Sequence, residues 1–168
     1  MATVIYKGNP VTLRGEIPKA GEKAPDFRFV KADLSEDSMS TMGGNIKILM
    51  AVPSLDTGVC AMETKKFNEK LSGIEGVAGL VISMDLPYAI RRFCELEGIK
   101  NVTGASDFRY REFIQNYNTE MTDGKMRGLS ARAVFIVDRK NVIRYTELVP
   151  EISTEPDYEK ALEVIRSL

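Results

Sequence analysis

The sequence predicts an α/β fold in which a mixed central sheet, flanked by helices, follows an N-terminal β-hairpin. Two apolar runs, residues 46–52 (broken only by Lys47) and 77–83, each precede a helix-favouring segment, which indicates buried parallel strands in strand–helix order. A later apolar run at 133–137, the turn-forming residues 138–141 and a returning strand at 142–148 predict an antiparallel pair. Alternating strands and helices that end in an antiparallel pair are typical of a mixed sheet with helices on both faces.

The N-terminal part of the chain predicts a short hairpin and one further strand. Residues 3–6 and 11–14 flank the tetrapeptide 7–10, whose Gly and Asn accept turn geometry and whose Pro punctuates the chain. An extended connector then leads to a strand at 27–30. The stretch 35–45 is polar and turn-rich, which predicts an irregular connection before the first central strand.

Four helices follow from the remaining pattern. A polar, helix-favouring segment runs over 62–71, and a second helix opens at Pro87, ends at Glu97 and is followed by Gly98. A short strand at 102–106 leads to an aromatic-rich helix at 110–117. One apolar face predicts a final helix after Asp157, formed by Tyr158, Ala161, Leu162 and Ile165.

Length and composition exclude several classes of protein. The chain has 168 residues, and neither an internal repeat nor a linker divides it, so we expect one domain over 1–168 with the hairpin in about its first 16 residues. A net charge of -1 favours neither nucleic acid nor an anionic membrane as partner. No uncharged apolar run approaches the roughly 20 residues of a membrane span. Residues 1–16 lack the apolar region of a secretory signal, so we expect a cytoplasmic, reducing compartment.

The chain contains two cysteines and no histidine. Without histidine, neither a Ser-His-Asp triad, a Cys-His dyad nor a histidine-ligated metal site can form. Cys60 lies where an apolar strand passes into a helix, and a helix N-terminus favours an anion through its free N–H groups and its dipole. A thiolate is the reactive form of cysteine. If the protein is an enzyme, its nucleophile is therefore a thiol that something other than imidazole activates.

The residues around Cys60 resemble a known family. The pattern Pro53-x-x-x-Thr57-x-x-Cys60 matches the active-site motif of the peroxiredoxins. The chain is most similar to their thiol peroxidase subfamily, the atypical 2-Cys peroxiredoxins, which implies a thioredoxin-like fold. The segments that carry this narrower resemblance, spread over most of the chain, are 54–60, 85–89, 92–94, 131–133, 147–152 and 155–158.

The resemblance implies a role for each of five residues. Cys60 would be the peroxidatic thiolate, which attacks a hydroperoxide and becomes a sulfenic acid. Cys94 would be the resolving thiol, which forms an intramolecular disulfide with Cys60 that a thioredoxin-like dithiol then reduces. Arg132 would stabilise the thiolate as a permanent cation, and the Thr57 hydroxyl would donate to the thiolate or to a peroxide oxygen. Pro53 would line the peroxide pocket without adding a hydrogen-bond donor.

Each of these residues also has a plain structural interpretation. Cys94 lies on a predicted helix beside an aromatic residue and is equally a small buried hydrophobe. Thr57 is a natural N-cap, Arg132 is of a type that usually forms surface ion pairs, and Pro53 can simply end a strand. Because Cys60 and Cys94 lie on separate predicted helices, we expect that the reduced conformation keeps them apart and that disulfide formation requires local unwinding.

We therefore predict a single-domain thiol peroxidase that reduces hydrogen peroxide and alkyl hydroperoxides, without a cofactor or metal. The resemblance also implies a homodimer. Two other functions are alternatives, and the second of them uses the same residues. A thioredoxin-like dithiol oxidoreductase normally needs two close cysteines, and the chain has no C-x-x-C motif. A peroxide sensor would oxidise Cys60 and pass the change to a partner without turnover.

Overall fold

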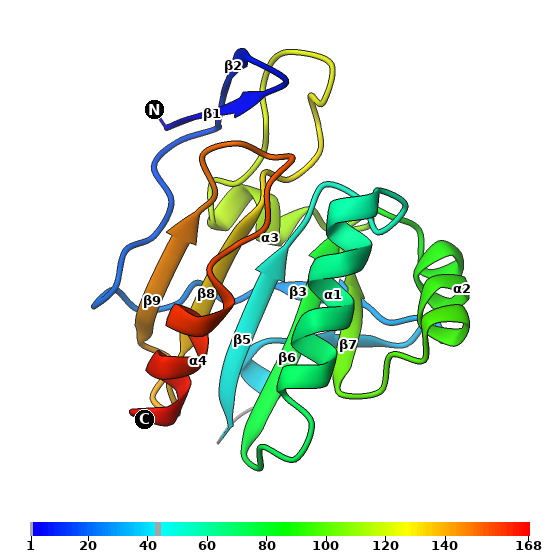
Figure 1. The fold of residues 1–168 in the computed structure, drawn as a ribbon, viewed down its shortest axis with the longest axis vertical. Coiled ribbons are helices and arrows are strands. Elements are labelled where there is room, and N and C mark those ends of the chain that lie inside the picture. Colours follow the sequence, from blue (N-terminus) through cyan, green and yellow to red (C-terminus); the bar gives the residue numbers. More distant parts are fainter. Residues whose placement is uncertain (1, 43–44) are drawn as a thin grey trace.

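A seven-stranded mixed sheet forms the centre of the molecule (Figure 1). The computed structural model describes residues 2–42 and 45–168; Met1, and Gly43 and Gly44 within the stretch predicted to be irregular, lie outside the described residues. The strand order is β4-β3-β7-β6-β5-β8-β9. Parallel pairing joins β5 to β6 and β6 to β7, and the other neighbours are antiparallel. The strands are β3 (Arg28–Val30), β4 (Glu36–Ser38), β5 (Ile46–Ala51), β6 (Val77–Ser83), β7 (Val102–Ser106), β8 (Ala133–Val137) and β9 (Ile143–Leu148).

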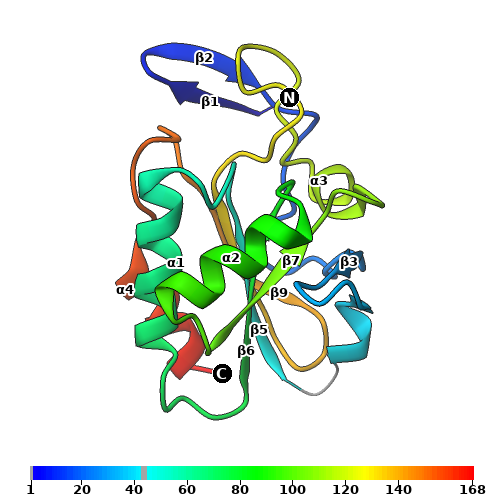
Figure 2. The same cartoon turned by 90° about the vertical axis from the view of Figure 1, so that its right-hand side faces the viewer.

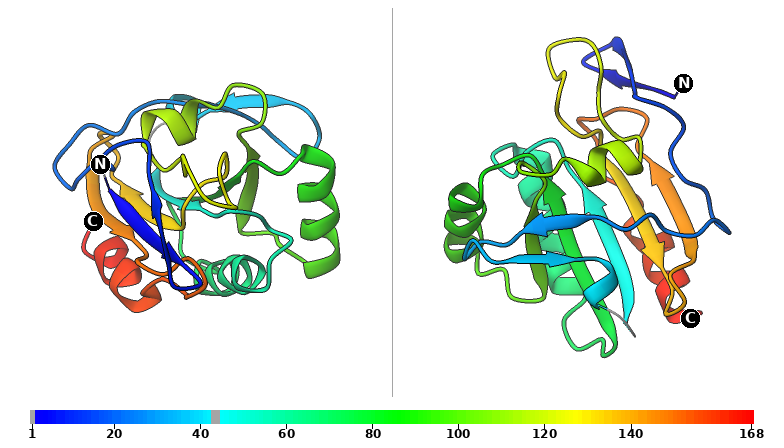
Figure 3. Two further views of the ribbon diagram at one scale, coloured as in Figure 1. Left: turned by 90° about the horizontal axis from the view of Figure 1, so that it is seen from above. Right: turned by 180° about the vertical axis from the view of Figure 1, so that it is seen from behind.

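Helices cover both faces of this sheet, as the sequence predicts. All six residues of β5 are buried, and its side chains alternate between two cores. One core packs against α1 (Gly58–Lys70), α2 (Pro87–Glu97) and α4 (Tyr158–Arg166). The other packs against the short α3 (Glu112–Asn116) and an aromatic cluster, and α3 appears on the far side of the sheet in Figure 3. The continuous apolar runs of the central strands follow from this burial on both faces.

The N-terminal hairpin lies over the end of the sheet at which α1 begins (Figure 2). Its strands are β1 (Thr3–Tyr6) and β2 (Asn9–Thr12). The turn is the pair Lys7-Gly8, both with positive φ, so the second strand starts two residues before the predicted 11–14. Pro10 is tolerated within β2 because this strand pairs on one side with β1 in a two-stranded sheet. Backbone hydrogen bonds between Ile5 and residues 150 and 152 fasten the hairpin.

Three further differences from the sequence prediction concern β4, α1 and α3. Strand β4 and a 3₁₀ helix (Ser40–Met42) occupy part of the stretch predicted to be irregular, because β4 pairs at the sheet edge with β3 despite its polar sequence. Helix α1 starts at Gly58 instead of residue 62, since Gly and Val are poor helix formers that conceal the first turn. Helix α3 is shorter than the predicted 110–117. None of the described helices is long and apolar enough to cross a bilayer.

Candidate active site

The passage from β5 into α1 buries Cys60 at a helix N-terminus. Thr57 is the N-cap with an extended backbone, and Cys60 is the third residue of α1. The first N–H groups of a helix lack acceptors within the helix, so this turn presents positive charge around the thiol. Cys60 is 0% exposed and belongs to the core between the sheet and α1. The predicted position of Cys60, where a strand passes into a helix, is confirmed.

Arg132 places a cation directly on the Cys60 sulfur. Its Nη2 donates to Sγ of Cys60 at 3.2 Å, its Nη1 donates to Oε2 of Glu63 at 2.6 Å, and its Nε donates to the carbonyl of Ile152 at 2.9 Å. The side chain is 2% exposed and enters the site from the residue directly before β8. Three partners on two segments, α1 and the loop at Ile152, hold the planar guanidinium in one orientation, as a lysine ammonium could not be held.

Glu63 is the buried counter-ion of Arg132. The two residues form a salt bridge in which the carboxylate is 0% exposed. Burial raises the pKa of Glu63 to about 7, although the charge of Arg132 opposes that rise. For Arg132, burial lowers the pKa, but the charges of Glu63 and Cys60 outweigh it and the pKa is raised. Among the described residues, Oε1 of Glu63 has no hydrogen-bond partner. The site is thus a chain of sulfur, guanidinium and carboxylate enclosed in the core.

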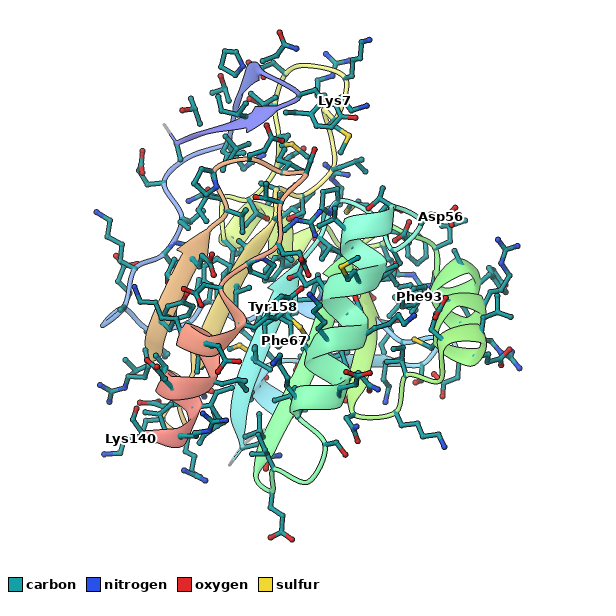
Figure 4. All side chains as sticks on the ribbon, viewed as in Figure 1. Lys7, Asp56, Phe67, Phe93, Lys140 and Tyr158 are labelled. Carbon is teal, nitrogen blue, oxygen red and sulfur yellow. The ribbon has the colours of Figure 1, made fainter. Side chains whose placement is uncertain are left out.

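Pro53 and Thr57 line a cavity of about 230 Å³ that reaches Arg132. Pro53 is buried, whereas Thr57 is exposed. The hydroxyl of Thr57 donates to the carbonyl of Ser54 at 3.0 Å, so in this conformation it is not committed to the sulfur. The tip of the hairpin also lines the cavity, and Figure 4 shows its Lys7 above the N-terminal end of α1. A small molecule in this cavity would lie beside the guanidinium that binds Cys60.

Cys94 lies outside this group, on α2. It is half-buried, carries a free thiol like Cys60, and packs against the same core. Burial, and then the charge of Glu95, raises the pKa of its thiol. A second cavity, of about 280 Å³, lies between the first turn of α1 and α2 and is lined by Gly58 and Phe93 among others. Figure 4 shows Phe93 between the two helices. In this conformation Cys60 and Cys94 therefore lie on two separate helices, and the cavity lies between these helices.

Comparison with known proteins identifies the family. The Redoxin family model matches residues 19–162. A thiol peroxidase of Leptospira interrogans is 56% identical over 164 residues, which are 96% of this chain and 96% of that protein. A thiol peroxidase of Aquifex aeolicus is 48% identical over 166 residues, covering 99% of this chain and 98% of that protein. The chain belongs to the thiol peroxidases of the Redoxin family. The resemblance seen in the sequence is confirmed.

Solved structures agree with this assignment. A peroxiredoxin-like protein of Aquifex aeolicus has a TM-score of 0.93 at 47% identity, with 98% of this chain and 96% of that chain covered. A thiol peroxidase of Chromobacterium violaceum, at 20% identity, shares the fold with a TM-score of 0.90 and covers 98% of this chain and 95% of its own. The predicted thioredoxin-like fold of a peroxiredoxin is confirmed.

Sequence reasoning missed Glu63 in this thiol peroxidase. Glu63 lies three residues after Cys60 on α1, so the two side chains share one face of the helix. An isolated glutamate on a polar helix resembles a solvent-exposed residue, and only its spacing from Cys60 could have drawn attention to it. In the part of the chain that the structure describes, no group of three or more Cys, Asp or Glu side chains is arranged to hold a metal ion.

Proposed function

We propose that this thiol peroxidase reduces hydrogen peroxide and alkyl hydroperoxides through a sulfenic acid on Cys60. The observation that carries the proposal is the 3.2 Å contact between Nη2 of Arg132 and the Cys60 sulfur inside a buried helix N-terminus. In the reaction, the thiolate attacks one peroxide oxygen and forms an S–O bond as the O–O bond breaks. The departing oxygen takes a proton and leaves as water or as an alcohol. Donors fixed around the sulfur lower the cost of the developing charge.

Thr57 and Pro53 complete the proposed peroxide pocket. The Thr57 hydroxyl would leave the Ser54 carbonyl and rotate toward the peroxide, which a hydroxyl does readily because its proton turns about one bond. Pro53 offers no N–H and is buried, so it would shape the cavity without competing for the peroxide oxygens. The cavity of about 230 Å³ is large enough for an alkyl hydroperoxide as well as hydrogen peroxide.

Cys94 would complete the cycle as the resolving thiol. It would attack the sulfur of the Cys60 sulfenic acid, forming the disulfide and releasing water. A thioredoxin-like dithiol would then reduce that disulfide by exchange and become oxidised itself. Because both cysteines belong to helices in the reduced protein, the first turn of α1 and the turns around Cys94 would have to unwind before the bond forms. Helix ends are regions of low local stability, which makes such opening accessible.

The expected homodimer and cytoplasmic location are part of the same proposal. Four large apolar side chains on α1, on α2 and at its start are exposed and would supply a surface for a second copy; they are Met62, Leu86, Tyr88 and Leu96. Analytical ultracentrifugation of the wild type and of a Leu96→Lys variant tests this surface. A dimer in the wild type that weakens in the variant supports it, and a wild-type monomer contradicts it.

Peroxide-dependent oxidation of NADPH, coupled through thioredoxin and its reductase, tests the proposed activity. The wild type should turn over steadily, and Cys60→Ser should show no turnover while remaining folded. Cys94→Ser is the matched second variant, and it should lose recycling but still react once with peroxide. Stoichiometric oxidation of the wild type without turnover would instead indicate a sensor. Rapid reduction of insulin disulfides without peroxide consumption would indicate a dithiol oxidoreductase.

A further inference from the structure

The carboxylate of Asp85 joins the two loops that lead to the cysteine-bearing helices. Its Oδ1 accepts a hydrogen bond from the Ser54 hydroxyl at 2.7 Å. Its Oδ2 accepts from the backbone N–H of Leu55 and from the Ser83 hydroxyl, each at 2.8 Å. Ser54 and Leu55 precede α1, whereas Asp85 lies two residues before the first residue of α2. One side chain thus ties the start of the Cys60 helix to the start of the Cys94 helix.

The backbone of Asp85 is itself fixed to the end of the sheet. Its carbonyl accepts from the hydroxyl of Ser106, the last residue of β7, at 2.5 Å. Its N–H donates to the hydroxyl of Ser83, the last residue of β6, at 3.2 Å. Asp85 therefore connects the loop before α1 to the ends of β6 and β7. It also lines the cavity of about 280 Å³ between α1 and α2.

Ser54 connects Asp85 through hydrogen bonds to the N-cap of the helix that bears Cys60. Its hydroxyl donates to Asp85, and its carbonyl accepts from both the N–H and the hydroxyl of Thr57. The hydrogen bonds of Asp85 thus extend to the N-cap of α1, three residues before Cys60. A charged acceptor forms stronger hydrogen bonds than a neutral one, so loss of this carboxylate should release the loop more than loss of a neutral partner.

We propose that Asp85 is a positioning residue that keeps Cys60 seated against Arg132 and sets the rate at which the first turn of α1 opens for disulfide formation. The inference rests on the proposed function, because it concerns the step in which the Cys94 thiol attacks the Cys60 sulfenic acid and releases water. Asp85 touches neither sulfur. It favours the seated state, in which Cys60 reacts with peroxide, and disfavours the open state, in which Cys60 reacts with Cys94.

The test is Asp85→Asn in the full chain, with rapid mixing to measure both steps separately. Asparagine keeps the size but removes the charge and one of the two acceptor oxygens. Loss of one charge-assisted hydrogen bond predicts disulfide formation faster by at least about tenfold and slower reaction with peroxide. At excess peroxide, the fraction of Cys60 over-oxidised to sulfinic acid should fall, because faster disulfide formation protects the sulfenic acid.

Two further variants separate positioning from general destabilisation. Ser106→Ala removes one of the bonds that fix the Asp85 backbone but leaves its carboxylate intact, so it should shift the ratio of disulfide to sulfinic acid less than Asp85→Asn does. Ser54→Ala removes one bond to the carboxylate and should shift that ratio in the same direction as Asp85→Asn, which keeps the test decisive if Asp85→Asn does not fold. Unchanged or slower disulfide formation in Asp85→Asn or Ser54→Ala, or an equal shift in Ser106→Ala, overturns the proposal.

The wild type distinguishes failure of this inference from failure of the proposed function. If wild-type protein forms the disulfide after peroxide and the Asp85 variant behaves identically, only the positioning role is wrong. If wild-type protein forms no disulfide, the proposed function and the inference that rests on it fail together.

Discussion

Replacing Arg132 by methionine should damage both the stability and the chemistry of the site, and the two effects can be separated. The substitution removes the cation that binds the Cys60 sulfur and leaves the Glu63 carboxylate, 0% exposed, without its partner. Breaking a buried ion pair in this way costs about 3–5 kcal/mol of unfolding free energy. This loss of unfolding free energy depends on pH, because a Glu63 side chain that binds a proton no longer carries an unpaired buried charge. Without the opposing charge of Arg132, the pKa of Glu63 rises further, so the penalty grows as pH increases.

The double variant Arg132→Met/Glu63→Gln isolates the catalytic part of the effect. It removes both charges, so urea unfolding near pH 8 should show most of the lost stability restored. Reaction with peroxide should stay slow, because the donor to the sulfur is still missing. One charge-assisted donor is worth about 1.5–3 kcal/mol, which corresponds to roughly one to two decades in rate.

Two results would refute this reasoning. A stable double variant that reacts with peroxide at the wild-type rate would show that Arg132 is a structural residue and not the activating cation. An Arg132→Met protein as stable as the wild type near pH 8 would show that the ion pair of Arg132 and Glu63 is not buried from solvent.

Three further predictions follow from the same geometry. Thr57→Val removes a hydroxyl at nearly constant volume and should slow peroxide attack by about tenfold in rapid mixing; an unchanged rate would leave the hydroxyl only its bond to the Ser54 carbonyl. Burial raises the pKa of Glu63 from 4.5 to about 7, so its proton stabilises the folded state below pH 4.5 and this stabilisation is lost as pH rises through 7. Between about pH 5 and 8 the wild type should therefore lose about 2–3 kcal/mol relative to Glu63→Gln, and parallel pH curves would contradict the shift. In the oxidised protein, amide exchange should accelerate at residues 57–61 and around Cys94 while the sheet is unchanged; identical exchange in both redox states would exclude local unwinding.

The central strands could be predicted from the sequence because burial on both faces leaves a clear trace. Apart from Lys47, residues 46–51 form one apolar run, and the structure buries all six in β5. Strand β4 leaves no such trace, since its polar residues pair at the sheet edge and only the partner strand makes them a strand. The sequence did not reveal the first turn of α1 for a related reason. Gly58 has a weak helix propensity, which packing outweighs in the folded protein.

The site shows the same division. The position of Cys60 follows from a strand that passes into a helix, a local pattern that one sequence reveals. Its contact with Arg132 spans 72 positions, and only the resemblance to a family indicated it before the fold brought the two together. The ion pair with Glu63 and the bond from Thr57 to Ser54 depend on side-chain orientation inside a finished core. Such details have no counterpart in composition, periodicity or spacing.

Intact-mass spectrometry after one equivalent of peroxide tests most directly whether Cys60 is attacked and Cys94 resolves. The wild type should lose two hydrogens as the disulfide forms, Cys94→Ser should gain one oxygen, and Cys60→Ser should keep its mass. Two results would contradict the account: uptake of oxygen by Cys60→Ser, or a wild type that does not lose two hydrogens.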